Sequence, residues 1–299
     1  MSEIKVNSVK GVSASSAAIS IDNSDGSCSA NLSSINNGQL SGFRNLFLNG
    51  AMQHNQRVQT GTLGYYNPVT ASIYTLDRWR FAVGSSFDTN SARITQDSSG
   101  PDGFSKSWKI EIFNTQTPSG SENAGVEQRM EAQNFQGLAY GTSAAKTMTL
   151  SFYVKSFKTG TYCVQIMQED GSKYQLHEYT INQSNTWERK TITIVGNTSD
   201  AIDNNSDIGL RVVWALACGP DDHVAATSSW ASGGSFHATS NQVNLWDNSN
   251  NDWFLTGCQL EIGSVATDFE HRSFGQELTL CQRYYISSVS YTHLRAHET

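Results

Sequence analysis

The chain has 299 residues, of which 37% are hydrophobic and only 16% are charged. Its seven Trp, eleven Tyr and thirteen Phe can build a real core, which excludes a chain that is disordered throughout. The formal net charge of −7, without a long basic run, argues against broad electrostatic binding of nucleic acid. No stretch approaches the roughly 20 apolar residues of a membrane helix, and the opening MSEIKVNSVK lacks the apolar run of a signal peptide. We therefore expect a protein made in the cytoplasm.

Residues 1–40 contain no aromatic residue and consist of short Val and Ile alternations broken by Ser, Gly and Asp. Ile4, Val6 and Val9 predict one short strand, and residues 18–21 predict another. Side chains this small cannot bury a core in a single chain, but three intertwined copies can. One interpretation is therefore an extended β segment in an oligomeric shaft. The alternative is an N-terminal leader without fixed structure.

Residues 41–272 carry the pattern of many short strands. In SWKIEIF at 107–113, Trp108, Ile110 and Ile112 share one face, and polar residues occupy the other. Asp170-Gly171 gives a hairpin signal. Similar runs occupy 149–156, 164–166, 173–181, 189–195 and 208–217. The pattern predicts an all-β fold, an antiparallel jelly-roll β-sandwich.

The period changes near the C-terminus. Ser273 and Gln276 match a capping box, and Leu278, Cys281 and Tyr285 recur at helical spacing. We therefore expect a short helix within 273–288 that packs beneath the sandwich. Residues 289–299 form a separate tail.

Five cysteines are scattered along the chain without a CxxC motif or a histidine at zinc-ligand spacing. Their odd number and wide spacing predict buried free thiols, and we expect no cofactor and no metal. The cysteines are Cys28, Cys163, Cys218, Cys258 and Cys281.

Two dense regions carry a resemblance to a known family. RNLFLNGAMQHNQR at 44–57 and YTLDRWRF at 74–81 form the first, and WFLTGCQLEIGSVATDFEHRSFGQELTLCQRYY at 253–285 forms the second. Together they resemble the bracketing strands of a jelly-roll domain in bacteriophage tail fibres, above all those of marine and cyanobacterial phages. That domain is similar to carbohydrate-binding modules.

The resemblance implies a virion structural protein, a homotrimer that attaches to host-surface glycans through many weak contacts. Residues 1–40 would be its shaft or its attachment to other tail or baseplate proteins. SYTHLRAHET at 290–299 resembles the translated sequencing-adapter tail of metagenomic reading frames, and related fibres continue after the CQRYY motif.

The main alternative is a carbohydrate-binding module of a secreted bacterial polysaccharide-degrading system, which shares the sandwich. An enzyme is not expected, because the chain has no GxSxG, HExxH, P-loop or dinucleotide-binding motif. The acid pairs Glu127/Glu131 and Asp221/Asp222 are interpreted as solvated surface residues. A hydrolase would need two carboxylates that face one cleft.

The sugar-binding hypothesis depends on aromatic side chains, which stack on pyranose rings. Tyr65 and Tyr66 in GYYNP, Trp230 in SSWASGG and Trp246 in NLWDNSNNDW lie outside obvious strands and are the ligand-binding candidates. Turn packing or a scaffold role is the alternative for each. The remaining tryptophans lie in strand-like runs and are expected in the core. They are Trp79, Trp108, Trp187, Trp214 and Trp253.

Charged residues near the first motif suggest a link between the chain ends. We expect Arg78 or Arg80 to pair with a carboxylate such as Glu261 or Glu270 and so to tie the first and last strands together. The resembling carbohydrate modules often hold a structural calcium near these strands. This chain has Ala51-Met52 where those modules tend to carry an acidic or aromatic residue, which argues against calcium here.

Overall fold

The computed structural model describes residues 8–9, 19–21, 24, 28–30, 43–57, 72–84, 87 and 92–287. The chain divides into two compact units, Met1–Gly42 and Phe43–Thr299. In the first, β1 (Ser8–Val9), β2 (Ile19–Ile21) and β3 (Cys28–Ala30) form an antiparallel sheet in that order. The strand predicted at 18–21 is therefore present as β2. Ile4 and Val6 lie outside the described residues, and intertwining of copies stays a prediction.

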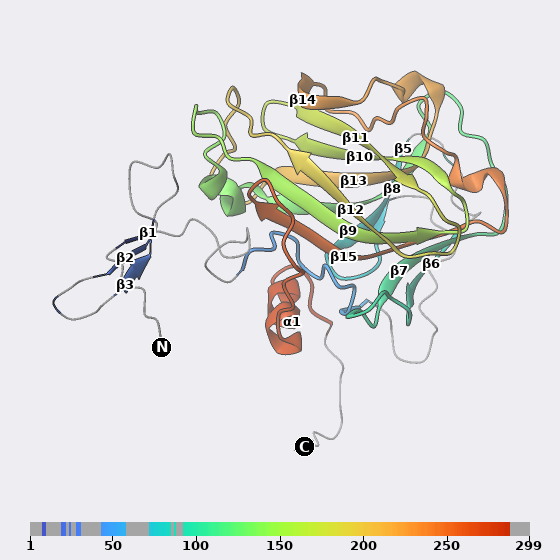
Figure 1. Cartoon of the computed structure of the whole chain (residues 1–299). Coiled ribbons are helices and arrows are strands. Elements are labelled where there is room, and N and C mark those ends of the chain that lie inside the picture. The colour runs from blue at the N-terminus through green and yellow to red at the C-terminus, as the bar shows by residue number, and fades with distance from the viewer. Residues whose placement is uncertain are drawn as a thin grey trace, which may run out of the picture. The chain divides into compact units, whose positions relative to one another are not determined.

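The second unit is an all-β sandwich of two antiparallel sheets (Figure 1). In the seven-stranded sheet the order is β14-β11-β10-β13-β8-β5-β4, and in the five-stranded sheet it is β12-β9-β15-β7-β6. The chain crosses repeatedly between the sheets, as from β8 to β9 to β10, which is the connectivity of a jelly roll. The predicted fold class is confirmed.

The elements of this unit have the following bounds. The seven-stranded sheet contains β4 (Ile73–Tyr74), β5 (Trp79–Gly84), β8 (Asn123–Glu131), β10 (Gly160–Gln168), β11 (Lys173–Ile181), β13 (Ile208–Cys218) and β14 (Thr227–Ser232). The five-stranded sheet contains β6 (Ala92–Asp97), β7 (Ser107–Ile112), β9 (Met148–Ser156), β12 (Glu188–Ile194) and β15 (Asp252–Ile262). The helical elements are η1 (Ala132–Leu138), η2 (Pro220–Asp222), η3 (Leu245–Asp247) and α1 (Phe274–Gln282).

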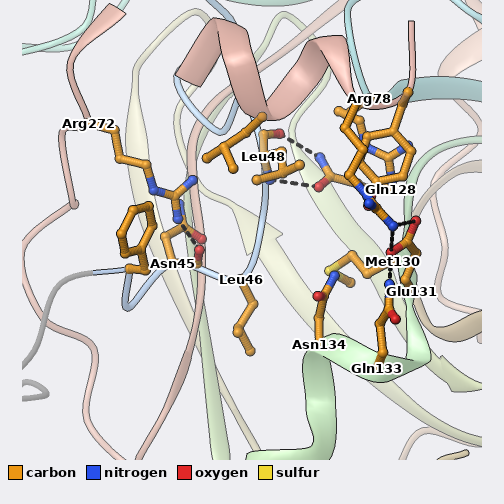
Figure 2. Close-up of a pocket in the computed structure, with 14 residues that line it drawn as sticks. Asn45, Leu46, Leu48, Arg78, Gln128, Met130, Glu131, Gln133, Asn134 and Arg272 are labelled. Carbon is orange, nitrogen blue, oxygen red and sulfur yellow. Dashed lines mark hydrogen bonds and ion pairs between the residues drawn. The ribbon is translucent and has the colours of Figure 1, made fainter. Parts of the chain in front are cut away.

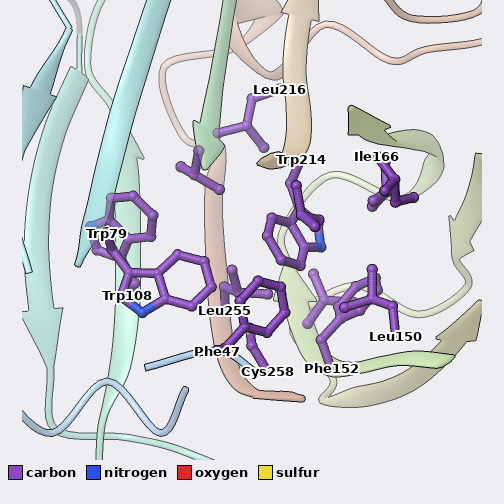
Figure 3. Close-up of a cluster of buried hydrophobic side chains, with 14 of the residues drawn as sticks. Phe47, Trp79, Trp108, Leu150, Phe152, Ile166, Trp214, Leu216, Leu255 and Cys258 are labelled. Atoms are coloured by element: carbon purple, nitrogen blue, oxygen red, sulfur yellow. The ribbon is translucent and has the colours of Figure 1, made fainter. Parts of the chain in front are cut away.

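The core lies between the two sheets and is rich in aromatic rings (Figure 3). Trp79 of β5 lies 5.8 Å from Trp108 of β7 and 5.7 Å from Trp214 of β13, measured between ring centroids. All three side chains are fully buried. Tilted contacts at this spacing add about 0.5–1.5 kcal/mol each beyond area burial. Period-two alternation therefore placed these residues correctly.

The outer face of the seven-stranded sheet is partly covered. Cys163, Met167, Leu176 and Val213 point away from the main core and pack with Ala238, which belongs to the segment after β13. This segment buries the outer face over β10, β11 and β13. The outer face over β5 and the neighbouring part of β8 remains open as a hollow.

Helix α1 occupies most of the predicted helical segment. Ser273 stands at the N-cap, but its hydroxyl makes no cap hydrogen bond, so the predicted capping box is not formed. The first turn is closed instead by the Glu277 N–H, which donates to the Ser273 carbonyl at 3.0 Å. Cys281 faces inward and is 1% exposed. The helix therefore depends on packing rather than on its cap.

Four of the cysteines, Cys163, Cys218, Cys258 and Cys281, are free and buried, as predicted. Burial raises the pKa of all four thiols. The side chain of the fifth, Cys28, lies outside the described part. Within the described residues, no helix has the length and apolar character to cross a membrane.

Candidate functional site

A hollow of about 380 Å³ opens on the outer face of β5, β8 and β13. We call it the arginine cleft, because three arginines reach it from three strands. Cross-strand pairing places Arg80 opposite Glu127, and Arg129 opposite Arg211. The residues that line the cleft are Ser72, Arg80, Ala82, Val83, Gly84, Ser121, Asn123, Glu127, Arg129, Arg211, Asp222, Ser235 and Phe236.

Glu127 lies beneath these arginines with 1% of its side chain exposed. Arg80 donates to its Oε1, and Arg129 donates to the same oxygen through Nε at 2.7 Å. Nη1 of Arg211 lies 3.5 Å from Oε2. A buried carboxylate is tolerated only when it is paired in this way. The expectation that Glu127 is a solvated surface acid is therefore wrong.

The guanidinium groups keep hydrogen-bonding capacity. The structure gives Arg80 a hydrogen bond only through Nη1, and Arg129 only through Nε, within the described part of the chain. Side-chain exposure is 18% for Arg80, 28% for Arg129 and 17% for Arg211. Arg211 also pairs with Glu169 at 2.9 Å. Unused donors with fixed positions are suited to recognise a carboxylate, a sulfate or a row of hydroxyls.

Two glycines shape the floor of the cleft. A Cβ on Gly125 would lie 3.0 Å from the ring of Phe236, so this ring packs directly on the β8 backbone. A Cβ on Gly84 would lie 2.5 Å from the side-chain nitrogen of Asn123. Glycine within a strand often marks such a close approach. The cleft thus combines an aromatic ring and an amide with the arginines.

A larger pocket of about 450 Å³ lies beside helix α1 (Figure 2). Several polar side chains that line this pocket are already engaged in hydrogen bonds or ion pairs with other residues of the chain. The side chain of Gln128 makes two 2.9 Å hydrogen bonds to the backbone of Leu48, and Arg272 donates to the Asn45 carbonyl. Arg283 pairs with Glu131 at 2.9 Å. We interpret this helix pocket as the structural joint that fastens residues 43–57 and α1 to the sandwich.

The expected pairing of Arg78 or Arg80 with Glu261 or Glu270 is wrong. Arg80 pairs with Glu127. The Arg78 guanidinium lies 3.4 Å from the centroid of the Tyr284 ring, where burial lowers its pKa. This stacking, rather than an ion pair with a carboxylate, links the first motif to the last.

The two glutamates named in that expectation have other partners. Glu270 accepts from the backbone N–H groups of Arg44 and Asn45 at 3.0 and 2.9 Å. Glu261 accepts from Thr267, through its N–H at 2.9 Å and its hydroxyl at 2.7 Å. The Glu270 contacts connect the first motif to the last across 225 residues and more. The link between the chain ends thus exists, with different residues.

The structure separates the predicted ligand residues. Trp246 is fully buried, with its ring 5.0 Å from Phe87, so it belongs to the core and has no face for a sugar. Trp230 is half-buried in β14, and its Nε1 donates to the Val195 carbonyl at 2.8 Å. Tyr65 and Tyr66 lie outside the described residues. Of the two described candidates, neither Trp230 nor Trp246 lines the arginine cleft.

The other sequence-based expectations have mixed outcomes. Trp187 is half-buried just before β12, 6.0 Å from Phe254, so its expected place in the core is wrong. The acids Glu127 and Glu131 line different pockets and do not face one cleft. Asp222 lines the arginine cleft, and its neighbour Asp221 is exposed. No cluster of three or more His, Cys, Asp or Glu suited to a metal occurs among the described residues.

Sequence reasoning missed Arg129 and Arg211 and expected a different partner for Arg80. Arg80 and Arg129 lie among small, amide and acidic outward residues of their strands, and Arg211 lies beside the apolar Val213 on the outer face of β13. From the sequence alone, a single charged residue within a strand is interpreted as a solvent-exposed position. A possible signal was Gly125 in NAGVEQRME, because a glycine inside a strand marks the close approach of another group.

No protein-family model and no curated protein sequence matches the chain. Solved structures with similar architecture include a putative sugar binding protein from Bacteroides thetaiotaomicron (13% identity, TM-score 0.42, 73% of this chain and 99% of that one). Another is the family 22 carbohydrate binding module of Clostridium thermocellum Xyn10B (15%, 0.32, 69% and 96%). A third is the enzymatically active domain of bacteriophage CBA120 tailspike protein 4 (10%, 0.41). The match covers 74% of this chain but only 22% of the tailspike chain.

Proposed function

We propose that this chain is a non-catalytic glycan-binding protein whose arginine cleft holds an acidic sugar residue. One observation carries the proposal: three guanidinium groups converge on a hollow of about 380 Å³ while a single buried carboxylate, Glu127, anchors them from below. The carboxylate fixes the positions of the arginines. It uses only some of their N–H groups, so the others remain available to a ligand in the cleft.

The remaining lining supports a saccharide rather than a bare anion. Asn123, Ser121 and Ser235 supply amide and hydroxyl groups for sugar hydroxyls, and the Phe236 ring offers an apolar surface. A uronate carboxylate or a sulfate ester would accept paired hydrogen bonds from a guanidinium. Asp222, on the cleft wall, would accept from a ring hydroxyl.

Two features support a binding role over catalysis. Glu127 is held by arginine contacts and is almost inaccessible, so it is not free to donate a proton or attack a sugar. Glu131, the other acid of its pair, lies at the helix pocket instead. The carboxylate pair that a hydrolase requires is therefore not offered by these two residues.

In its larger role the chain is proposed to be a phage tail-fibre protein that forms homotrimers in the virion and attaches to host glycans by avidity. The motifs at 44–57 and 253–285 support this role, as does the separate β unit at its N-terminal end. The alternative is a carbohydrate-binding module of a secreted polysaccharide-degrading system. Light scattering coupled to size exclusion on residues 1–288 distinguishes them: a stable trimer supports the fibre, and a monomer supports the free-standing module.

The glycan proposal is tested by electrophoresis in native gels that contain alginate, a soluble polyuronate. We expect the wild-type chain to be retarded and Arg129→Gln to weaken binding about tenfold or more, because a hydrogen bond to a charged group contributes about 1.5–3 kcal/mol. Arg93→Gln, a surface arginine of β6 that pairs with Glu111, is the matched control and should bind like wild type. Equal retardation of all three chains would exclude the cleft as the binding site.

A further inference from the structure

A second hollow lies on the opposite side of the sandwich, on the outer face of the five-stranded sheet, with a volume of about 220 Å³. Tyr153 of β9 and Arg189 of β12 are cross-strand partners on this face. Phe104, which precedes β7, and residues 268–271, which follow β15, form the walls. We call this hollow the aromatic pocket. Segments distant in the sequence thus meet around Tyr153.

A β-bulge creates the floor of the aromatic pocket. The register of β15 against β9 shifts between Thr256 and Gln259, and Gly257 lies within the shift with a φ of +60°. A Cβ at Gly257 would lie 2.9 Å from both the Phe104 and the Tyr153 rings. Only glycine lets both rings reach the backbone here. The bulge therefore holds two aromatic rings against the sheet on its outer side.

Four rings form a connected cluster at the pocket. The ring centroid of Phe104 lies 5.5 Å from Tyr153, 5.0 Å from Phe269 and 5.3 Å from His271. Phe104, Tyr153 and Phe269 are half-buried, and His271 is exposed. They lie outside the core between the sheets. Aromatic rings that remain partly exposed in a hollow offer stacking surface to a ligand.

Polar groups with unused capacity surround the rings. The Tyr153 hydroxyl, the Asp268 carboxylate and the His271 ring have no hydrogen-bond partner among the residues that the structure describes. Arg189 donates through Nη2 to the Thr267 carbonyl at 2.6 Å. This hydrogen bond holds the guanidinium at the residue that precedes Asp268 in the sequence. Asp268 and Arg189 line the same hollow, and the charges of these two groups offset each other.

We propose that the aromatic pocket is a second saccharide site, which takes a neutral sugar ring. The apolar face of a pyranose would stack on the Tyr153 and Phe104 rings, and its hydroxyls would bond to Asp268 and Arg189. A neutral ligand is favoured because the lining holds one arginine and one aspartate, in contrast to the three arginines of the arginine cleft. The two sites lie on outer faces of different sheets, so this inference stands independently of the proposed function.

The surface beside the pocket favours a ligand of more than one sugar. Lys155, two residues after Tyr153 on the same face of β9, lies 3.9 Å from the centroid of the Phe254 ring and 5.1 Å from that of Trp187. Trp187 is half-buried. Phe254 is buried beneath Lys155, so the half-buried Trp187 is the aromatic ring beside the pocket that an oligosaccharide could reach.

The test uses the full chain in native gels that contain hydroxyethyl cellulose, galactan or mixed-linkage glucan, all neutral. We expect retardation of the wild type by at least one of them, and a loss of at least tenfold in affinity for Tyr153→Ala and for the exposed-site variant Asp268→Ala. Phe113→Ala, a partly exposed aromatic at the far end of β7, is the matched control and should bind like wild type. Thermal unfolding of each variant checks that it is folded.

The outcomes separate the two sites. Neutral binding that is lost in Tyr153→Ala and kept in Arg129→Gln supports the aromatic pocket, whatever the result with alginate. No retardation of the wild type in any neutral gel overturns the proposal, as does retardation of Tyr153→Ala and Asp268→Ala that equals that of the wild type. A change of solution mass in Tyr153→Ala would show instead that this face contacts another protein chain, and would also overturn it.

Discussion

At the scale of single residues, Gly257 is the position where the backbone depends most directly on the absence of a side chain. Its positive φ costs an L-residue about 1–2 kcal/mol, and the new Cβ would meet two rings at 2.9 Å. We expect Gly257→Ala to lower the free energy of unfolding by about 2 kcal/mol or more, measured by urea denaturation. Gly275→Ala in α1 is the control, because no atom lies within 4 Å of its Cβ. It should be neutral or stabilising by up to about 1 kcal/mol. Equal losses in both would contradict the steric argument.

Single residues also show where sequence reasoning succeeds. Trp108 and Trp214 were predicted in the core because they share the apolar face of an alternating strand, and both are fully buried. In TLSFYVKS at 149–156, period two puts Tyr153 on the same face as Ser151 and Lys155, so an outward aromatic is visible in the sequence. The position of Phe104 and Phe269 in the same ring cluster as Tyr153 could not be predicted, because both residues lie in loops whose paths depend on the whole fold.

At the scale of elements, the connection from β11 to β12 contains the clearest pH-sensitive contact. Burial raises the pKa of Glu188, but hydrogen bonds from Lys190 and from Gln183 and Asn182 outweigh it and lower the pKa to about 2. A carboxylate with a folded-state pKa below its ordinary 4.5 stabilises the fold above about pH 4.5 and loses this contribution as the pH falls toward 2.

We therefore expect Glu188→Gln to be less stable than wild type at pH 7, with the difference shrinking between pH 4.5 and 2. Thermal unfolding of both proteins across this range measures it. A difference that stays constant with pH would show that the ionised carboxylate contributes nothing through these hydrogen bonds.

The strands also show which secondary structure hydrophobic alternation can predict and which it cannot. The bounds of β7, β9 and β13 are close to those of the predicted runs. In each strand, every second side chain points into the core, which makes the strand visible in the sequence. Strand β8 was not predicted, since residues of both its faces are buried and the sequence GVEQRM shows no alternation. The outer side of β8 carries Glu127 and Arg129. These two residues were therefore missed for the same reason as the strand.

At the scale of the whole molecule, the sandwich presents two hollows on the outer faces of its two sheets. The arginine cleft suits an acidic sugar and the aromatic pocket a neutral one, so one copy could hold two positions of a mixed polysaccharide or two chains. Trimerisation would multiply these contacts and convert weak binding into firm attachment. This arrangement suits an adhesive fibre, and it would also suit a free-standing module at lower avidity.

The most direct test of glycan binding is a calorimetric titration of the wild-type chain with alginate oligosaccharides at 50 and 200 mM NaCl. The account predicts saturable binding that weakens at the higher salt, because guanidinium–carboxylate contacts at a partly exposed site are screened by ions. It also predicts that binding falls to the limit of detection in Arg129→Gln. Absence of binding at low salt, or binding that salt and the substitution both leave unchanged, would contradict it.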